Sequence, residues 1–434
     1  MDMTFGKTVL KTGILILLPL FALLLMAGCQ GRPAQTETPY AAETPFPGGE
    51  GLRIAVASDL HLNPDDTKKG KEASAVQYNM ELVDALLWDA EQQGAEMILL
   101  TGDLVNGGRY SRHAALAAKL KQAEESGLDV YVLPGNHDLA PVTQTEFAAF
   151  YTEFGYGEAF SRDKTSLSYC VIRGDLMLLM MDTAGYSVGA IDLRDPPDHG
   201  EAFLSEETLR WAEAMLQKAA EEKLRVLCAG HYNLLPETSR LHNSGYYVEN
   251  AERFAALLRR WGVPLYLSGH MHLRAVYREE GLTELLTEFL LSYPTGYSML
   301  DLTDEGIRYL PRRVDVDAWA AQAGETDPVL LRFSAWQQEG LRAYSQTNVA
   351  YMAARNPLSR REKKEAAEFF YTAMDDYWNG SLCEKRGELE SMPGYEPFFR
   401  CAEGYAYGAW LKDLIANAVP ELRGFSLPWR PQTK

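Results

Sequence analysis

The chain has 434 residues, which is enough for a large α/β domain and a smaller additional one. It carries 60 acidic and 42 basic residues, and its formal charge is −18. Because nucleic-acid backbones are held mainly by Lys and Arg, this charge disfavours nonspecific nucleic-acid binding. We therefore expect no nucleic-acid partner.

The amino terminus has the pattern of an export signal. Lys7 and Lys11 precede an apolar run at residues 14–27. The small residues just before Cys29 resemble a bacterial lipoprotein box, which implies that residues 1–29 form a signal peptide and that Cys29 is lipidated. A plain transmembrane anchor is the alternative, although the run is short for the ~30 Å hydrocarbon core of a bilayer.

A tether follows this signal. Residues 30–51 contain four prolines and four glycines and have almost no apolar pattern, so we predict a flexible linker. The N-terminal lipid anchor would hold the rest of the chain at a membrane surface. We expect an extracytoplasmic, membrane-anchored lipoprotein.

Beyond the tether, short apolar runs alternate with segments of helical periodicity, which is the pattern of an α/β domain. We predict strands at residues 53–58, 97–101, 130–133, 168–172, 176–181, 225–229 and 265–268, and closing antiparallel strands at 274–278, 285–289, 297–302 and 307–313. We predict helices at residues 79–93 and 111–126, and helix starts at Ser205 and Asn250. Two sheets flanked by helices, spanning residues 52–317, would satisfy the layer rules.

The pattern changes at residue 318, and we predict a C-terminal helical subdomain at residues 318–434. Helical periodicity returns at residues 327–355 and 359–379. Ten aromatic residues follow this periodicity, namely Trp319, Phe333, Trp336, Tyr344, Tyr351, Phe369, Phe370, Tyr371, Tyr377 and Trp378. They could line a lipid or sugar groove, but at helical spacing we expect them to pack as a core.

The cysteines beyond Cys29 fall into two groups. Cys170 and Cys228 lie in apolar strands, where we expect buried, inert thiols. Cys383 and Cys401 share the helical subdomain of an exported protein, in which oxidation is permitted. We predict a disulfide between them, with two free buried thiols as the alternative.

Five short polar segments follow predicted strands. They are Asp59-Leu60-His61, Gly102-Asp103, Gly135-Asn136-His137-Asp138, Gly230-His231 and Gly269-His270-Met271-His272. The first three are separated by about one strand, one helix and the next parallel strand, so their side chains should converge at one edge of a sheet. Carboxylate, amide and imidazole groups suit a pair of divalent metal ions that share a carboxylate.

The five segments, in this order, resemble the calcineurin-like metallophosphoesterase family, whose pattern reads D-x-H, G-D, G-N-H-D or E, H, and G-H-x-H. The resemblance covers residues 53–313 and implies a four-layer α/β/β/α sandwich. Carried over by position, it implies that Asp59, His61 and His272 hold one metal, that Asn136, His231 and His270 hold a second, and that Asp103 bridges them. His137 would protonate the leaving oxygen, with Asp138 as its orienting partner.

The resemblance implies two divalent ions, with Mn, Fe, Zn and similar metals open. Such ions lower the pKa of bound water to roughly 7, so a bridging hydroxide could attack phosphorus in line. We expect a small phosphoester substrate and favour phosphodiesters, because the D-x-H and Gly-Asn-His-Asp segments look similar to the cyclic-nucleotide phosphodiesterase branch. A phosphomonoesterase, nucleotidase or protein phosphatase on the same metals is the alternative. A lipoprotein that binds a phosphorylated ligand without turnover is a second alternative, which His137 argues against.

Three histidines lie outside these segments. His113 is on a predicted helix remote from the motifs, and we expect it to be a solvated surface residue. His199 and His242 lie in predicted loops beside strand ends, where substrate contacts are common. Both are candidates for substrate contact, although the polarity of a loop alone would also place a histidine there. Of the two, His242 is the stronger candidate because its loop leaves from His231.

Overall fold

The computed structural model describes residues 51–66, 75–184, 202–235 and 246–429. The predicted signal peptide with Cys29, most of the tether, and both His199 and His242 lie outside these ranges. Among the described residues, no helix is both long enough and apolar enough to cross a bilayer.

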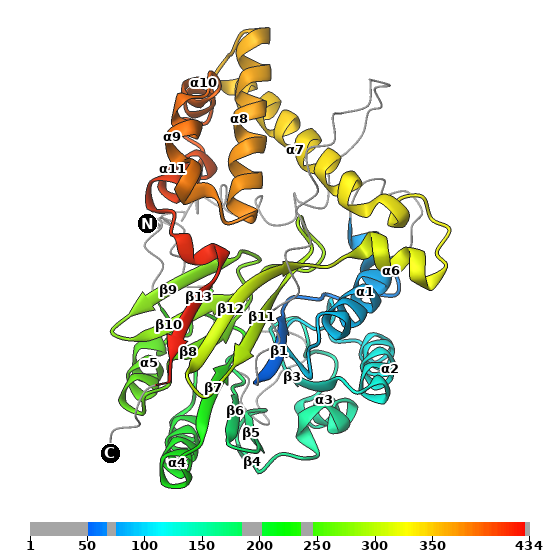
Figure 1. The fold of residues 1–434 in the computed structure, drawn as a ribbon, viewed down its shortest axis with the longest axis vertical. Coiled ribbons are helices and arrows are strands. Elements are labelled where there is room, and N and C mark those ends of the chain that lie inside the picture. Colours follow the sequence, from blue (N-terminus) through cyan, green and yellow to red (C-terminus); the bar gives the residue numbers. More distant parts are fainter. Residues whose placement is uncertain (1–50, 67–74, 185–201, 236–245, 430–434) are drawn as a thin grey trace, which may run out of the picture.

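Two sheets form the centre of the molecule (Figure 1). The first contains, in spatial order, β13 (Phe425–Pro428), β12 (Gly306–Arg313), β11 (Gly296–Leu302), β1 (Leu52–Ala57), β2 (Met97–Thr101) and β3 (Asp129–Leu133). Its strands β1, β2 and β3 are parallel, with Ile54 opposite Met97 and Met97 opposite Asp129. Strand β11 pairs with β1 in the antiparallel direction. Every residue of β2 is buried, which explains its uninterrupted apolar sequence.

The second sheet contains β4 (Ser161–Arg162), β5 (Tyr169–Arg173), β6 (Leu176–Met180), β7 (Arg225–Ala229), β8 (Leu265–Ser268), β10 (Leu282–Leu286) and β9 (Ala275–Glu279) in spatial order. Strands β6, β7, β8 and β10 are parallel, and antiparallel strands extend both sides. The carboxyl ends of β7 and β8 therefore reach the same edge of this sheet.

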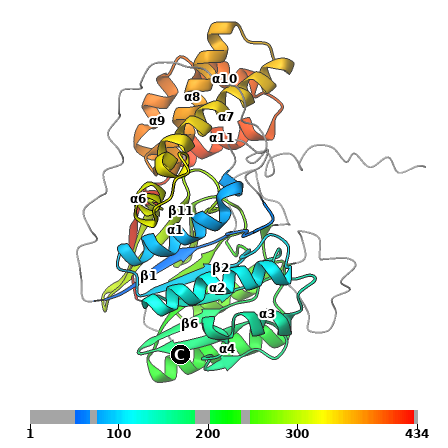
Figure 2. The same ribbon diagram turned by 90° about the vertical axis from the view of Figure 1, so that its right-hand side faces the viewer.

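Helices cover both sheets, as the four-layer sandwich requires (Figures 1 and 2). The first sheet is flanked by α1 (Asn79–Gln92), α2 (Tyr110–Ser126) and α6 (Val316–Ala323), with α3 (Gln144–Phe150) beside α2. The second sheet packs against α4 (Glu206–Glu222) and α5 (Ala251–Arg260). Short helical turns lie at η2 (Ala75–Tyr78) and η3 (Thr152–Tyr156).

The predicted helix starts are both found, but only one is capped by its own side chain. Ser205 accepts a hydrogen bond from the Thr208 amide (3.0 Å) and thereby begins α4. Asn250 precedes α5, but its side chain instead exchanges hydrogen bonds with the backbone of Leu204 (3.0 and 2.7 Å). Asn250 therefore ties two helix starts together.

The C-terminal helices form a separate layer above the sandwich (Figures 1 and 2). They are η5 (Leu330–Arg332), α7 (Phe333–Arg355), α8 (Arg360–Trp378), α9 (Leu382–Ser391), α10 (Tyr395–Cys401) and α11 (Ala406–Asn417), followed by η6 (Pro420–Arg423). A capping box between Ser359 and Glu362 begins α8. Most of the ten aromatic residues are buried as predicted, but Tyr351 is 62% exposed.

Two expectations for this region need correction. The described part of the chain does not end in helices, because β13 returns to the first sheet and pairs with β12. In addition, Cys383 and Cys401 are both free thiols in the structure. They lie on different helices, α9 and α10, and the Cys401 thiol donates to the carbonyl of Phe398 within its own helix (3.2 Å). Cys170 and Cys228 are buried thiols, as expected.

Candidate metal centre

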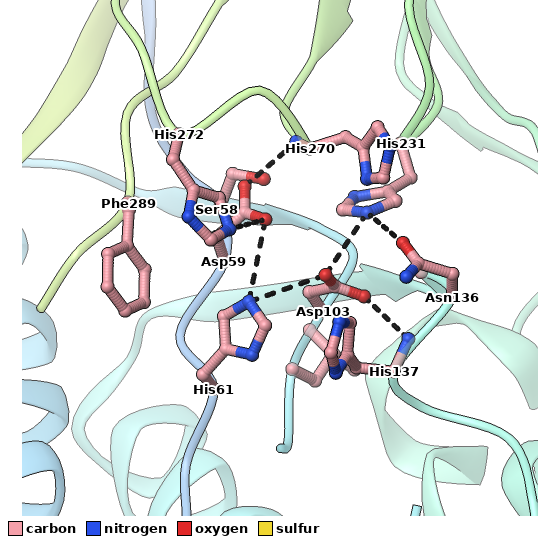
Figure 3. A network of polar contacts seen from close by, with 12 residues as sticks. Ser58, Asp59, His61, Asp103, Asn136, His137, His231, His270, His272 and Phe289 are labelled. Carbon is pink, nitrogen blue, oxygen red and sulfur yellow. Dashed lines mark hydrogen bonds and ion pairs between the residues drawn. The ribbon is translucent and has the colours of Figure 1, made fainter. Parts of the chain in front are cut away.

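The five polar segments meet where the carboxyl ends of the strands from both sheets face one another (Figure 3). Asp59 and His61 follow β1, Asp103 follows β2, and Asn136 follows β3. From the second sheet, His231 follows β7, and the His270–His272 segment follows β8. Parallel pairing thus brings together side chains separated by more than 200 positions.

Two groups of potential metal ligands share one carboxylate. Asp59, His61, Asp103 and His272 form the first group, and Asp103, His231 and His270 form the second; within each group the ligand atoms lie within 4.8 Å of one another. The Asn136 Oδ1 atom faces His231 Nε2 at 3.2 Å, which places this amide beside the second group. All seven predicted ligands are therefore at one site.

The two oxygens of the shared carboxylate have different surroundings. Asp103 Oδ1 accepts a hydrogen bond from the His137 amide (2.8 Å). Asp103 Oδ2 lies 3.4 Å from His61 Nε2 and 3.4 Å from His231 Nε2, between the two groups. The backbone contact fixes the carboxylate, so that Oδ2 faces both ligand groups and could serve as a ligand in each.

The donor atoms fit divalent cations. Asp59 Oδ1 and His61 Nε2 are buried and make no hydrogen bond of good geometry, although Asp59 Oδ1 lies 3.2 Å from His272 Nε2 and His61 Nε2 lies 3.4 Å from Asp103 Oδ2. A bound cation would satisfy such closely spaced buried donor atoms. Burial alone would lower the pKa of His61, but the Asp103 and Asp59 carboxylates outweigh it and raise the pKa to about 10. The pKa of His231 is raised to about 9 because the Asp103 carboxylate likewise outweighs burial. The carboxylates thus favour positive charge here, and mixed nitrogen and oxygen donors suit Mn, Fe or Zn.

Most of the ligand residues have strained backbones. Positive φ values occur at Asp59 (53°), His61 (42°), Asp103 (50°), His270 (66°) and His272 (56°). Non-glycine residues in this region cost about 1–3 kcal/mol each and persist only where the surroundings hold them. Such a concentration of strain is typical of a functional site.

Glycines in the segments make room for the ligands. A Cβ atom on Gly135 would lie 2.3 Å from Asp103 Oδ1, and one on Gly269 would lie 2.6 Å from Asp59 Oδ2. Both distances are below van der Waals contact. These two glycines allow backbone to approach the carboxylates, which explains why each precedes a ligand in its segment.

A second set of contacts orients the ligands. His231 Nδ1 donates to the Thr101 carbonyl (2.8 Å), which leaves Nε2 free to act as a ligand. The Thr183 hydroxyl accepts from the His231 amide (3.1 Å). Asp59 Oδ2 accepts from the His270 amide (3.0 Å), and the Phe289 ring stacks on His272 with centroids 4.5 Å apart.

A fully buried carboxylate supports the loop that follows His231. Glu284 on β10 accepts hydrogen bonds from the amides of Leu234 and Leu235 and from the side chains of Asn233 and Ser268. Burial raises the pKa of Glu284 to about 7, although these hydrogen bonds oppose the shift. Glu284 was not among the predicted site residues, but a single acid inside the apolar run Leu-Thr-Glu-Leu-Leu is a signal that could have revealed it.

The expected role of Asp138 needs correction. Instead of orienting the His137 ring, its carboxylate accepts hydrogen bonds from the amides of Leu104, Val105 and Gly135 (3.1, 2.9 and 2.8 Å). Asp138 therefore fastens the loop after β2 to the loop after β3. Because these loops carry Asp103 and Asn136, Asp138 supports both groups of ligands.

His113 is also not the surface residue that we expected. Its side chain is fully buried, with Nε2 2.8 Å from the Asp138 carbonyl and Nδ1 2.8 Å from the Tyr151 hydroxyl. Burial lowers the pKa of His113 to about 4, so its ring is neutral. A carbonyl only accepts, so Nε2 carries the proton and Nδ1 accepts from Tyr151. His113 thus supports the loop that carries His137, through its hydrogen bond to the Asp138 carbonyl.

His137 itself is half-buried and lies beside both groups of ligands (Figure 3). Its ring centroid is 4.7 Å from that of His61, with the two rings nearly perpendicular. It belongs to neither group of ligand atoms. The structure therefore places an additional imidazole next to the position of the shared carboxylate.

Two sheets with a carboxylate shared by both ligand groups at their common edge form a candidate centre for two metal ions. The family model for calcineurin-like phosphoesterases matches residues 52–274, and the chain belongs to this family. Members of the family usually bind two divalent metals. A second model, for the C-terminal domain of cyclic nucleotide phosphodiesterase, matches residues 315–417. No curated protein matches the sequence.

Solved structures that resemble this chain include two phosphatases and a nucleotidase. A dimetal phosphatase from Danio rerio has 14% identity and a TM-score of 0.48, over 60% of this chain and 96% of its own. A purple acid phosphatase from yellow lupin (Lupinus luteus) has 13% identity and a TM-score of 0.43, over 62% and 52%. The NAD nucleotidase of Haemophilus influenzae has 14% identity and a TM-score of 0.37, over 61% and 50%. Similarity at this level does not indicate a substrate.

Proposed function

We propose that the protein hydrolyses phosphodiesters of small molecules at a centre of two divalent metal ions. The observation that carries this proposal is the position of Asp103 Oδ2, which lies 3.4 Å from a histidine nitrogen of each ligand group. Asp59, His61 and His272 would hold one ion, and Asn136, His231 and His270 the other. Such ions, when bound, neutralise phosphate charge and activate water at neutral pH.

His137 is the proposed general acid. Its ring lies beside His61 and outside the ligand groups, a position from which it could protonate a departing oxygen. The hydrogen bond from its amide to Asp103 Oδ1 fixes the position of His137 relative to the shared carboxylate. A protein that only bound a phosphorylated ligand would have no use for such an acid.

The preference for diesters rests on the two halves of the chain together. The C-terminal helices match a domain described for cyclic nucleotide phosphodiesterase, and the catalytic segments look similar to that branch. We also propose that the enzyme acts outside the cytoplasm, anchored by lipid at Cys29, which makes cytoplasmic cyclic nucleotides unsuitable as its substrate in the cell. This location rests on the amino-terminal sequence alone.

The test is metal analysis of the purified protein, followed by rates on matched substrates. We expect two divalent ions per chain and faster hydrolysis of bis(4-nitrophenyl) phosphate than of 4-nitrophenyl phosphate. The reverse preference would establish a phosphomonoesterase on the same metals. Metal uptake without turnover of any phosphoester would support a binding protein instead.

The role of His137 is tested separately through the leaving group. General-acid assistance increases with the basicity of the departing oxygen, and nitrophenolate leaves with little help. His137→Ala should therefore slow hydrolysis of an alkyl diester by about a hundredfold, the usual range for a positioned acid, and that of the nitrophenyl diester clearly less. Equal losses on both substrates, or loss of a metal ion, would contradict this role.

A further inference from the structure

The C-terminal helical layer touches the chain directly behind the first group of ligands. Arg274 lies two residues after His272 and is only 3% exposed. Its Nη1 atom donates to the carbonyl of Trp378, the last residue of α8 (2.9 Å), and its own carbonyl accepts from the Tyr377 hydroxyl (2.6 Å). The end of α8 therefore holds both the side chain and the backbone of Arg274.

The other edge of the Arg274 guanidinium pairs with Glu288, which is fully buried. Arg274 Nε donates to Glu288 Oε2 (3.0 Å), and Nη2 donates to Oε1. The pair packs tightly against the backbone of Gly296, since a Cβ atom on this glycine would lie 1.9 Å from Glu288 Oε1 and 2.7 Å from Arg274 Nη2. We call the four residues Arg274, Glu288, Tyr377 and Trp378 the latch.

The latch is connected to the ligand residues in two ways, through Arg274 and through Glu288. Through Arg274 it holds the chain that leaves His272, whose φ of 56° requires support from its surroundings. Through Glu288 it holds the next residue, Phe289, whose ring stacks on His272 and meets the edge of His61. The backbone of Phe289 also forms a bridge with Ser58, directly before Asp59.

We propose that the C-terminal helical domain is a positioning element for the first metal, acting through the latch on His272. Further contacts keep α8 docked, including hydrogen bonds from Tyr293 to Asp375 and from Arg313 to Asn379. Ligand positions must be held within roughly half an ångström for a productive site. The buried ion pair is poor evidence for added stability, but it fixes one arrangement of the groups around it.

This inference rests on the proposed two-metal centre, and its test measures metal binding instead of turnover. The probe is Mn²⁺ alone, titrated into the metal-free full chain by calorimetry. The two binding steps are assigned with His272→Ala, which should remove the first, and His270→Ala, which should remove the second. Fewer than two steps in the wild-type protein would contradict the proposed function itself.

The diagnostic variant is Tyr377→Phe, which keeps the ring but removes the hydroxyl that holds the Arg274 carbonyl. Residues that orient metal ligands typically contribute 10- to 100-fold to affinity, so we expect about a tenfold weaker first step and a clearly smaller change in the second. The matched control is Tyr407→Phe, because the Tyr407 hydroxyl contacts the Met374 sulfur (3.4 Å) within the helical domain. This control should leave both steps unchanged.

A second variant removes the ion pair without leaving a charge unpaired. Arg274→Met combined with Glu288→Leu replaces a buried pair by apolar groups, a change that is often tolerated by folding. The folded double variant should show the same selective loss of the first step. Wild-type affinity in both Tyr377→Phe and the double variant would overturn the inference, as would equal weakening by Tyr377→Phe and Tyr407→Phe.

Discussion

The buried His113 predicts a specific loss of stability in mild acid. An unfolded histidine has a pKa of about 6.5, whereas burial lowers the pKa of His113 in the folded protein to about 4. The unfolded chain therefore binds a proton more readily between these values, and stability falls as the pH decreases through this window. Above the unfolded pKa this contribution is fully present. From pH 7.5 to pH 5 the loss should reach about 2 kcal/mol.

Other buried groups titrate in the same range with the opposite sign. Burial raises the pKa of Asp89 and of Asp182 to about 6 each, so their protonation favours the folded state as the pH falls. The effect of His113 must therefore be isolated with a variant. His113→Phe keeps an aromatic ring beside Phe147 and Phe150 but cannot titrate.

The assay is urea unfolding of the metal-free wild-type and His113→Phe proteins at both pH values. At pH 7.5 the variant should be less stable, because the Tyr151 hydroxyl and the Asp138 carbonyl each lose a partner at about 1–3 kcal/mol. At pH 5 the difference between the proteins should be smaller by about 2 kcal/mol. A difference that stays constant with pH would refute the assignment of a neutral, buried His113.

Three further outcomes are expected. Asp103→Asn should abolish activity and remove at least one metal with the fold intact, because an amide nitrogen at the Oδ2 position cannot bridge two cations. Two-metal stoichiometry with near-normal turnover in this variant would contradict the shared site. Glu284→Gln should lower the free energy of unfolding by about 1–3 kcal/mol, since an NH₂ group would face backbone amides; unchanged urea midpoints would rule out this support. Cys29→Ser should prevent incorporation of labelled fatty acid, whereas a wild type that carries no lipid would contradict the anchor.

The strands and the ligand residues could be predicted because they depend on local sequence. Strands β2, β7 and β8 begin and end where their apolar runs do, and each run is followed by a ligand segment. The short strand β13 could not be predicted, since four residues with a terminal Pro428 carry no clear alternation and pair only because β12 offers an open edge. Its existence depends on a tertiary contact.

The burial of His113 was predictable in principle. On α2 it lies three residues before Leu116 and seven before Leu120, and all three are fully buried. This spacing is that of one helix face, so the apolar stripe already includes His113. The polar residue type favours exposure, whereas its position on the helix indicates burial. Its two hydrogen-bond partners offset the cost of burying the polar ring. They belong to other elements, so they cannot be inferred from the sequence of α2.

The contacts of Asp138 could not be predicted from its position next to His137 in the sequence. Following His137 directly, it was expected to orient that ring, but the Asp138 amide donates to the Gly135 carbonyl (3.3 Å) and closes a tight turn. The turn directs the Asp138 carboxylate toward the amides of Leu104 and Val105. The ligand residues of this site can thus be recognised in short sequence segments, whereas the groups that hold the ligands in place come from elsewhere in the fold.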